Sequence, residues 1–118
     1  LGYSQLLKIK KILNLKNKIH NIYKKKFDKS ENIHLLESPE ECKSNYWLNT
    51  LYLKNITEKE RDKILELLNR EGIQSRTAWN LLHRISFLSK CPRSDLKISE
   101  DLHSKIISIP SGPNLIRQ

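Results

Sequence analysis

The sequence predicts an α+β fold, in which a long N-terminal helix precedes a small, mainly antiparallel sheet with helices packed on one face. Three observations carry this prediction. Apolar residues recur every three or four positions through the first 28 residues, which is the period of a helix. Residues 45–53 form the best strand candidate, and the next segment has both a helix start and a helix stop signal. A length of 118 residues suits one domain with a buried core.

The first predicted element is a helix over residues 2–28, assigned from the spacing of Ile9, Ile12, Ile19 and Ile22. A helix of this length spans about 40 Å at ~1.5 Å per residue, which exceeds what a small domain needs. We therefore expect it to link two bodies, and we assign residues 1–28 to a linking helix and residues 29–118 to an α+β domain. Residues 1–30 also hold nine lysines and one aspartate, so most of the chain's net charge of +9 lies in this segment.

Residues 29–44 are polar and irregular, with a possible short strand at 33–36, and the main strand follows at 45–53. Alternation places Trp47, Asn49, Leu51 and Leu53 on one face of that strand. Large side chains occupy the other face as well, so both faces are expected to be covered. The pattern therefore indicates a central strand.

The most strongly signalled element is the helix that follows. Thr57 and Glu60 stand three residues apart and form a capping box, and Gly72 stands where a left-handed C-cap is expected. Its predicted buried stripe consists of four side chains: Ile64, Leu65, Leu67 and Leu68.

The last third of the chain is predicted with less regular patterns. We expect a short strand at residues 73–76, a short helix at 79–88 and a stop at Pro92. Ser94 or Asp95 is expected to cap a last helix near 96–106. The predicted apolar face of that helix comprises Leu96, Ile98 or Ser99, Leu102 and Ile106, and residues 107–109 lead to a Pro-Ser-Gly-Pro stop.

No set of residues in the chain forms a catalytic centre by its spacing. There is no Gly-x-Ser-x-Gly elbow, and only three glycines occur, so a glycine-rich phosphate loop is not expected. Cys42 and Cys91 lie far apart and are interpreted as reduced thiols, and the four histidines lack metal-ligand spacing. We predict no catalytic, cofactor-binding or metal-binding residue in this chain.

Arg76, Trp79 and His83 are the candidate substrate-binding residues. Arg76 follows a capped helix and a short strand, so its guanidinium is placed for a bidentate grip on a phosphate or carboxylate, or equally for a structural ion pair. Trp79 and His83 are four residues apart and would share a helix face. Trp79 could stack on a sugar or base while His83 donates to a hydroxyl, and the alternative is a core Trp beside a satisfied His.

At these residues the chain resembles the C-terminal small domain of the DegT-type, pyridoxal-phosphate (PLP)-dependent nucleotide-sugar aminotransferases, which have the aspartate-aminotransferase fold. The resemblance covers essentially the whole chain, and its motifs follow in the family's order. They are Leu1-Gly2-x-x-Gln5-Leu6, Lys18-Ile19-x-x-x-Tyr23, Asn45-Tyr46-Trp47, Arg61-Asp62, Gly72-Ile73-x-x-Arg76, Leu82-His83 and Ile107-x-Ile109-Pro110-Ser111. One departure is Thr77, where the family commonly has Pro after the arginine.

The resemblance implies a function for a parent protein. An amino donor, usually glutamate, would convert PLP to its amine form, which would aminate a nucleotide-linked keto-sugar for surface polysaccharide or glycan synthesis. The Schiff-base lysine and the other cofactor-binding residues belong to the family's large domain, so this chain alone is expected to be inactive. By the same analogy Arg76, Trp79 and His83 lie near the substrate entrance, and the parent is expected to be a cytoplasmic homodimer.

Other observations bear on whether the chain is a piece of a longer protein. It begins with Leu1 and contains no methionine, so we expect a fragment that starts inside a longer chain. No run of apolar residues approaches the length of a membrane span, and no signal peptide is visible.

Two alternative functions stay open at this stage. One is a basic nucleic-acid-binding module that uses the Lys-rich helix, which the scarcity of aromatic residues there disfavours. The other is a truncated or decayed gene product.

Overall fold

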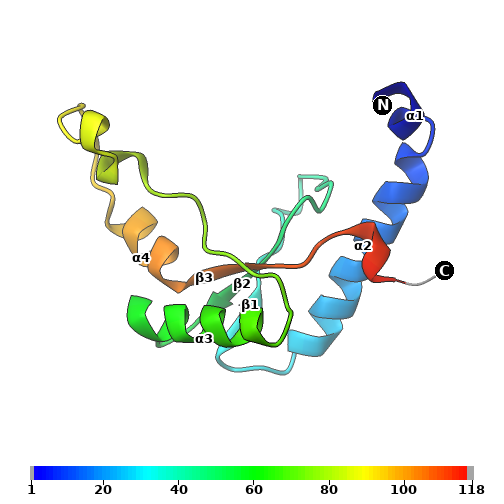
Figure 1. The fold of residues 1–118 in the computed structure, drawn as a ribbon, viewed down its shortest axis with the longest axis horizontal. Coiled ribbons are helices and arrows are strands. Elements are labelled where there is room, and N and C mark those ends of the chain that lie inside the picture. Colours follow the sequence, from blue (N-terminus) through cyan, green and yellow to red (C-terminus); the bar gives the residue numbers. More distant parts are fainter. Residues whose placement is uncertain (1, 117–118) are drawn as a thin grey trace.

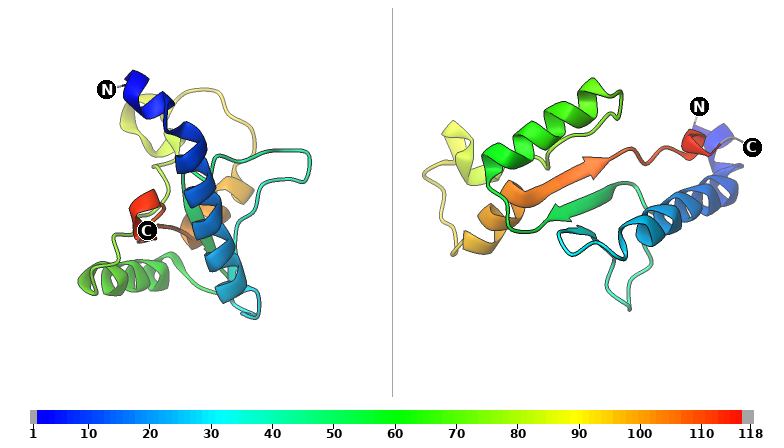
Figure 2. Two further views of the ribbon diagram at one scale, coloured as in Figure 1. Left: turned by 90° about the vertical axis from the view of Figure 1, so that its right-hand side faces the viewer. Right: turned by 90° about the horizontal axis from the view of Figure 1, so that it is seen from below.

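The computed structural model describes residues 2–116, and its centre is a three-stranded antiparallel sheet (Figures 1 and 2). The strands are β1 (Ile33–Leu35), β2 (Asn49–Leu53) and β3 (Ile106–Ile109), in the spatial order β1-β2-β3. Leu51 of the central strand pairs with Leu35 on one side and Ile107 on the other. The predicted α+β fold and the central position of the main strand are confirmed. Leu1, on which the expectation of a longer parent chain partly rests, lies outside the described residues.

Four α-helices and three single 3-10 turns are found in the described residues. The helices are α1 (Gly2–Leu6), α2 (Ile9–Phe27), α3 (Glu58–Arg70) and α4 (Lys97–Lys105), and the turns are η1 (Leu82–Arg84), η2 (Ser86–Leu88) and η3 (Pro113–Leu115). The long N-terminal helix is confirmed over α2, but a turn at Leu7 and Lys8 separates it from α1. At that turn the Lys8 N–H donates to the Gln5 carbonyl at 3.0 Å, an i to i−3 bond that tightens the chain locally. None of the described helices is long and apolar enough to cross a membrane.

One face of the sheet carries the hydrophobic core. Leu51 and Leu53 of β2 and Ile107 and Ile109 of β3 are buried there, because alternate residues of a strand point to the same face. Two helices cover this one face, as predicted. The covering side chains are Tyr23 and Phe27 from α2 and Ile64, Leu65 and Leu68 from α3.

Strand β2 is shorter at its start than predicted. It begins at Asn49, and Trp47 lies outside it. The reason is the backbone of Tyr46, which adopts a φ of +52°, a left-handed conformation that a strand does not contain. The preceding loop supports this turn, since the Trp47 N–H donates to Asn45 Oδ1 at 3.0 Å.

Helix α3 begins and ends as the sequence predicts. The Glu60 N–H donates to Thr57 Oγ1 at 3.3 Å and the Thr57 N–H donates to Glu60 Oε2 at 2.7 Å, which completes the capping box. At the other end Gly72 has a φ of +78°, and the Ile73 N–H donates to the Leu68 carbonyl at 2.8 Å, as in a Schellman cap. The predicted buried stripe is wrong at Leu67, which is 55% exposed.

The capping box yields a first prediction. Thr57→Ala removes the hydroxyl acceptor and is expected to lower the free energy of unfolding by about 1 kcal/mol, whereas Thr57→Ser retains the acceptor and should cost much less. Bonds from the Thr57 backbone and side chain lower the pKa of Glu60. The box therefore contributes fully above the usual glutamate pKa and loses its contribution as the pH falls through the lowered value. Urea unfolding of both variants at neutral and acid pH measures this, and an equal Thr57→Ala effect at both would contradict it.

Residues 73–105 differ most from the prediction. The short strand at 73–76 is reduced to one bridge, Arg76 with Ser108. The helix predicted at 79–88 is absent: two 3-10 turns replace it, because Ile85 takes an extended conformation (φ −81°, ψ 126°) between them. The last helix does form, but the predicted cap is wrong: the N-cap residue is Leu96, which makes no side-chain capping bond. Asp95 Oδ1, one residue before it, accepts from the Lys97 N–H at 3.1 Å. The predicted apolar face of this helix is wrong at Ile98, which is 78% exposed, and at Leu102, which is 41% exposed, while His103 is buried on the side toward α3.

Candidate functional site

Arg76 lies beside the free edge of β3. Its backbone pairs with Ser108: the Arg76 N–H donates to the Ser108 carbonyl at 3.0 Å and the Ser108 N–H donates to the Arg76 carbonyl at 2.8 Å. These two bonds fix the backbone of Arg76 while its side chain is exposed. The sequence prediction that Arg76 is held at a sheet edge therefore describes its position, although the segment is a bridge and not a strand.

Trp79 lies next to Arg76. The guanidinium carbon of Arg76 is 5.8 Å from the centroid of the Trp79 ring, within the range of a cation–π contact. Trp79 is 66% exposed, so the alternative of a core tryptophan is wrong. The extended course of the chain through this region, in place of a helix, leaves both side chains at the surface.

Trp47 completes the group, and sequence reasoning missed it. Its ring centroid lies 5.8 Å from that of Trp79, with the two planes tilted by 41°. Trp47 is 62% exposed. The sequence assigned Trp47 to a strand face, and the left-handed turn at Tyr46 is what takes it out of the strand. We call Trp47, Arg76 and Trp79 together the tryptophan–arginine cluster.

A hollow of about 300 Å³ adjoins the cluster at Arg76. Its lining comes from the end of β3 and the segments beside it: Leu48, Gln74, Ser75, Arg76, Ser108, Ile109, Pro110 and Ser111. The cluster thus offers a guanidinium between an aromatic surface and a partly polar hollow. This arrangement suits a ligand that carries a flat ring next to an anionic group.

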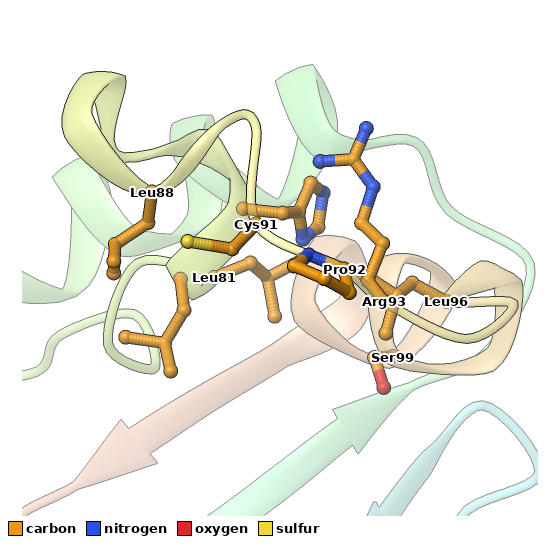
Figure 3. Close-up of a pocket in the computed structure, with 9 residues that line it drawn as sticks. Leu81, Leu88, Cys91, Pro92, Arg93, Leu96 and Ser99 are labelled. Carbon is orange, nitrogen blue, oxygen red and sulfur yellow. The ribbon is translucent and has the colours of Figure 1, made fainter.

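His83 lies in a different place. It belongs to η1, and its Nε2 is 2.8 Å from Glu100 Oε1 of α4. Its side chain is 15% exposed and borders a second hollow of about 370 Å³, which is mainly apolar (Figure 3). Leu81, Leu88, Cys91 and Leu96 line this hollow. Trp79 and His83 would share a face only if their segment were helical, and residues 77–81 are not helical in the structure.

Hydrogen bonds of polar side chains connect helix α2 to the start of β2 and to the turn after β3. In the interior, His20 Nδ1 donates to Asn49 Oδ1 at 2.9 Å, and Asn49 Nδ2 donates to Ser111 Oγ at 3.1 Å. The Ser111 hydroxyl also accepts from the Asn49 N–H at 2.7 Å and donates to the Ile109 carbonyl at 2.8 Å. Tyr23 Oη donates to the Pro110 carbonyl at 3.0 Å. Helix α2 is therefore bonded to the end of the sheet and to the Pro-Ser turn.

The sequence of the whole chain matches one known protein family. Residues 1–118 match the DegT/DnrJ/EryC1/StrS aminotransferase family. The chain belongs to this family. No curated protein sequence matches it.

Solved structures support the same fold. The Helicobacter pylori protein PseC, an aminotransferase involved in the biosynthesis of pseudoaminic acid, superposes with a TM-score of 0.87 at 22% identity, over 98% of this chain and 31% of that chain. The putative sugar aminotransferase Spr1654 from Streptococcus pneumoniae, in its PMP form, gives 0.86 at 21% identity, over 98% and 30%. DesI, solved in the presence of its TDP-sugar product, gives 0.86 at 18% identity, over 99% and 30%. The DegT-family chain therefore spans about 30% of the length of these structures.

Lys16 does not fit the covalent anchor of PLP. Such an anchor needs a lysine amine of lowered pKa, and burial does lower the pKa of Lys16. Lys16 Nζ, however, donates to the Tyr46 carbonyl at 3.1 Å and the Ser111 carbonyl at 2.8 Å, so it is engaged in holding two backbone segments. The glycines, Gly2, Gly72 and Gly112, are too widely separated in sequence for a glycine-rich phosphate loop.

Proposed function

We propose that this chain is the C-terminal small domain of a longer, PLP-dependent aminotransferase that aminates a nucleotide-linked keto-sugar for surface polysaccharide or glycan synthesis. The observation that carries the proposal is the family match over residues 1–118. It is supported by the similarity to three aminotransferase structures of which this chain covers only about a third, namely 31%, 30% and 30%. PLP would supply the amino-group chemistry from a site made by other residues of the parent protein.

In this proposal residues 1–28 are the helix that links two domains and residues 29–118 are the small domain. Exposed apolar side chains on the N-terminal part support a linking role, since Tyr3 is 77% exposed and Leu7 is 71% exposed. Such side chains are normally covered in an assembled protein. The isolated chain is expected to be inactive, and the parent is expected to act as a cytoplasmic homodimer with glutamate as the amino donor.

Arg76, Trp79 and His83 are proposed to contact the substrate. Arg76 is suited to the diphosphate of a nucleotide sugar, because a guanidinium donates two parallel bonds to phosphate oxygens. Trp79 beside it offers a flat apolar surface for a sugar or base. His83 would act from its own position on η1, where Glu100 orients the imidazole through the 2.8 Å contact.

The test of this function uses the full-length parent protein. We expect the purified protein to show the visible absorbance of bound PLP, and to transfer the amino group of glutamate to at least one member of a panel of nucleotide-linked keto-hexoses. Absence of both bound cofactor and transamination would overturn the proposal. Sequencing the gene upstream of the Leu1 codon supports it if an open frame encodes a large domain with a candidate Schiff-base lysine.

The proposed role of Arg76 makes a second prediction. Arg76→Lys keeps the charge but loses the bidentate geometry, so KM for the nucleotide sugar should rise by roughly 10-fold while KM for glutamate is unchanged. Arg70→Lys on the exposed side of α3 is the matched control, because Arg70 pairs only with Glu66 in the described contacts. Equal KM values for Arg76→Lys and the wild type would remove Arg76 from the substrate site.

The two alternative functions gain no support from the family match. A basic module that binds nucleic acid predicts affinity that falls steeply with added salt, and a decayed product predicts self-association through the exposed apolar side chains of α1 and α2.

A further inference from the structure

Two exposed tryptophans meet although they lie 32 positions apart in the sequence. Trp47 and Trp79 are the chain's only tryptophans. Their contact at 5.8 Å leaves each more than 60% exposed, at 62% and 66%. Exposed indole rings stay in contact with water, whereas burial would remove their apolar surface from it. An indole pair that remains at the surface therefore needs other contacts to hold it in place.

That support comes from helix α2. Lys16 Nζ donates to the carbonyls of two consecutive residues, Tyr46 at 3.1 Å and Trp47 at 3.4 Å. It also donates to the Ser111 carbonyl at 2.8 Å, across 95 positions of sequence. One ammonium group therefore ties the Trp47 loop to the Pro-Ser turn at the end of β3.

The conformation that Lys16 holds is a costly one. Tyr46 adopts a φ of +52°, in the left-handed region that bulky residues avoid. The Tyr46 ring packs on His20 at a centroid distance of 4.5 Å. Burial of Lys16 also opposes its charge, as its lowered pKa indicates. The bonds of Lys16 to three carbonyls act against both costs.

We propose that Lys16 is a positioning residue that holds Trp47 against Trp79, and that Trp47 is a further substrate-binding residue beside Arg76 and Trp79. This surface would take a ring of the substrate near its diphosphate, either the flat nucleobase or the apolar face of the sugar. The ligand part of this inference rests on the proposed function, whereas the geometric part does not. The two parts are therefore tested separately.

The geometric part is tested on the 118-residue chain by near-ultraviolet circular dichroism. Because the only two indoles contact each other, the wild type should show a coupled indole signal that Trp47→Phe and Trp79→Phe each abolish. Lys16→Met should reduce the coupled signal by at least half while the helical far-ultraviolet signal persists. Lys18→Met makes the same charge change on an exposed position of the same helix and should leave the signal unchanged.

Three further results decide this part. Lys16→Arg, which keeps a cationic donor, should recover part of the coupled signal that Lys16→Met loses. If Lys16→Met does not fold, Lys16→Gln takes its place, because the amide keeps donors and still shortens their reach. A folded Lys16→Met or Lys16→Gln protein with the full coupled signal would overturn the positioning role, as would a wild type without coupling.

The ligand part is tested on the full-length protein by steady-state kinetics. Trp47→Ala removes one stacking surface and should raise KM for the nucleotide sugar by roughly 10-fold, with a smaller change in kcat. Inhibition by uridine diphosphate and by N-acetylglucosamine 1-phosphate is measured separately to identify the ring that Trp47 contacts. The inhibitor whose Ki rises in Trp47→Ala is the one that contains this ring. Unchanged KM and unchanged Ki for both would overturn the binding role, whereas a wild type without turnover would contradict the proposed function itself.

Discussion

Replacing Arg61 with leucine is expected to lower the free energy of unfolding by roughly 3 kcal/mol, the largest effect we predict for a single side chain here. Arg61 lies in the amphipathic helix α3, yet it is only 2% exposed. Its Nη1 donates to the carbonyl of His103 at 3.0 Å, and Nη2 donates to Glu58 Oε1 at 3.2 Å. The guanidinium thus bonds α3 to the end of α4.

The size of the effect follows from what leucine leaves behind. The His103 carbonyl loses its donor in a buried place, which costs about 1–3 kcal/mol. Glu58 Oε1 also lies 3.7 Å from Arg84 Nη1 and 3.9 Å from His103 Nδ1. Removing Arg61 therefore also disturbs the contacts of these two side chains with Glu58. Arg61 Nε lies 2.8 Å from Asp62 Oδ1 without the alignment of a hydrogen bond, so we assign little of the effect to that contact.

Urea unfolding of Arg61→Leu and of Arg70→Leu makes the comparison. Arg70 stands on the same helix and pairs with Glu66 at 3.0 Å, but both side chains are about 70% exposed, at 69% and 72%. A pair this exposed contributes little, at most about 0.5 kcal/mol. Equal effects of the two substitutions would show that burial of Arg61 does not stabilise the α3–α4 contact.

Asn49→Leu is the second large expected change, at roughly 2 kcal/mol of destabilisation. Asn49 is 1% exposed at the start of the central strand. Its amide oxygen accepts from His20 Nδ1 at 2.9 Å and its amide nitrogen donates to Ser111 Oγ at 3.1 Å. Leucine has a similar volume but neither polar atom, so it leaves the buried His20 nitrogen without its partner.

A double-mutant cycle separates this network from simple packing. His20→Leu alone should cost about as much as Asn49→Leu, because each leaves a buried polar group unpaired. With both residues replaced, neither leaves the other unpaired. The destabilisation of the double variant should therefore fall short of the sum of the two single effects by about 1–2 kcal/mol. Additive free energies of unfolding, measured by urea titration, would mean that the His20–Asn49 bond contributes nothing.

The local parts of the fold were predictable because their causes are local. The capping box and the C-cap glycine of α3 depend on residues three to fifteen apart, and both appear in the structure at Thr57, Glu60 and Gly72. The alternation around Leu51 and Leu53 identified the central strand in the same way. The helix predicted at 79–88 is absent, because extended backbone at Ile85 separates two short 3-10 turns.

The candidate site was only half predictable. Arg76 and Trp79 stand three residues apart, so their proximity follows from a short stretch of chain. Trp47 and Lys16 reach the same surface only through loop closure and through helix α2. Their signal in the sequence was present but ambiguous: a lysine in an apolar part of a helix, and a tryptophan just before a strand.

The α+β class, the caps of α3, the central strand and the family resemblance could be predicted from the sequence alone. Periodicity and capping depend on residues close together in the chain, and the resemblance rests on several motifs in a set order along it. Tertiary structure alone decided which polar side chains are buried and which apolar ones are exposed. Arg61, Asn49 and His103 are buried, while Trp47, Trp79 and Ile98 are exposed. The physical reason is that burial of a polar group depends on partners from distant segments, such as the His103 carbonyl for Arg61 and Ser111 for Asn49.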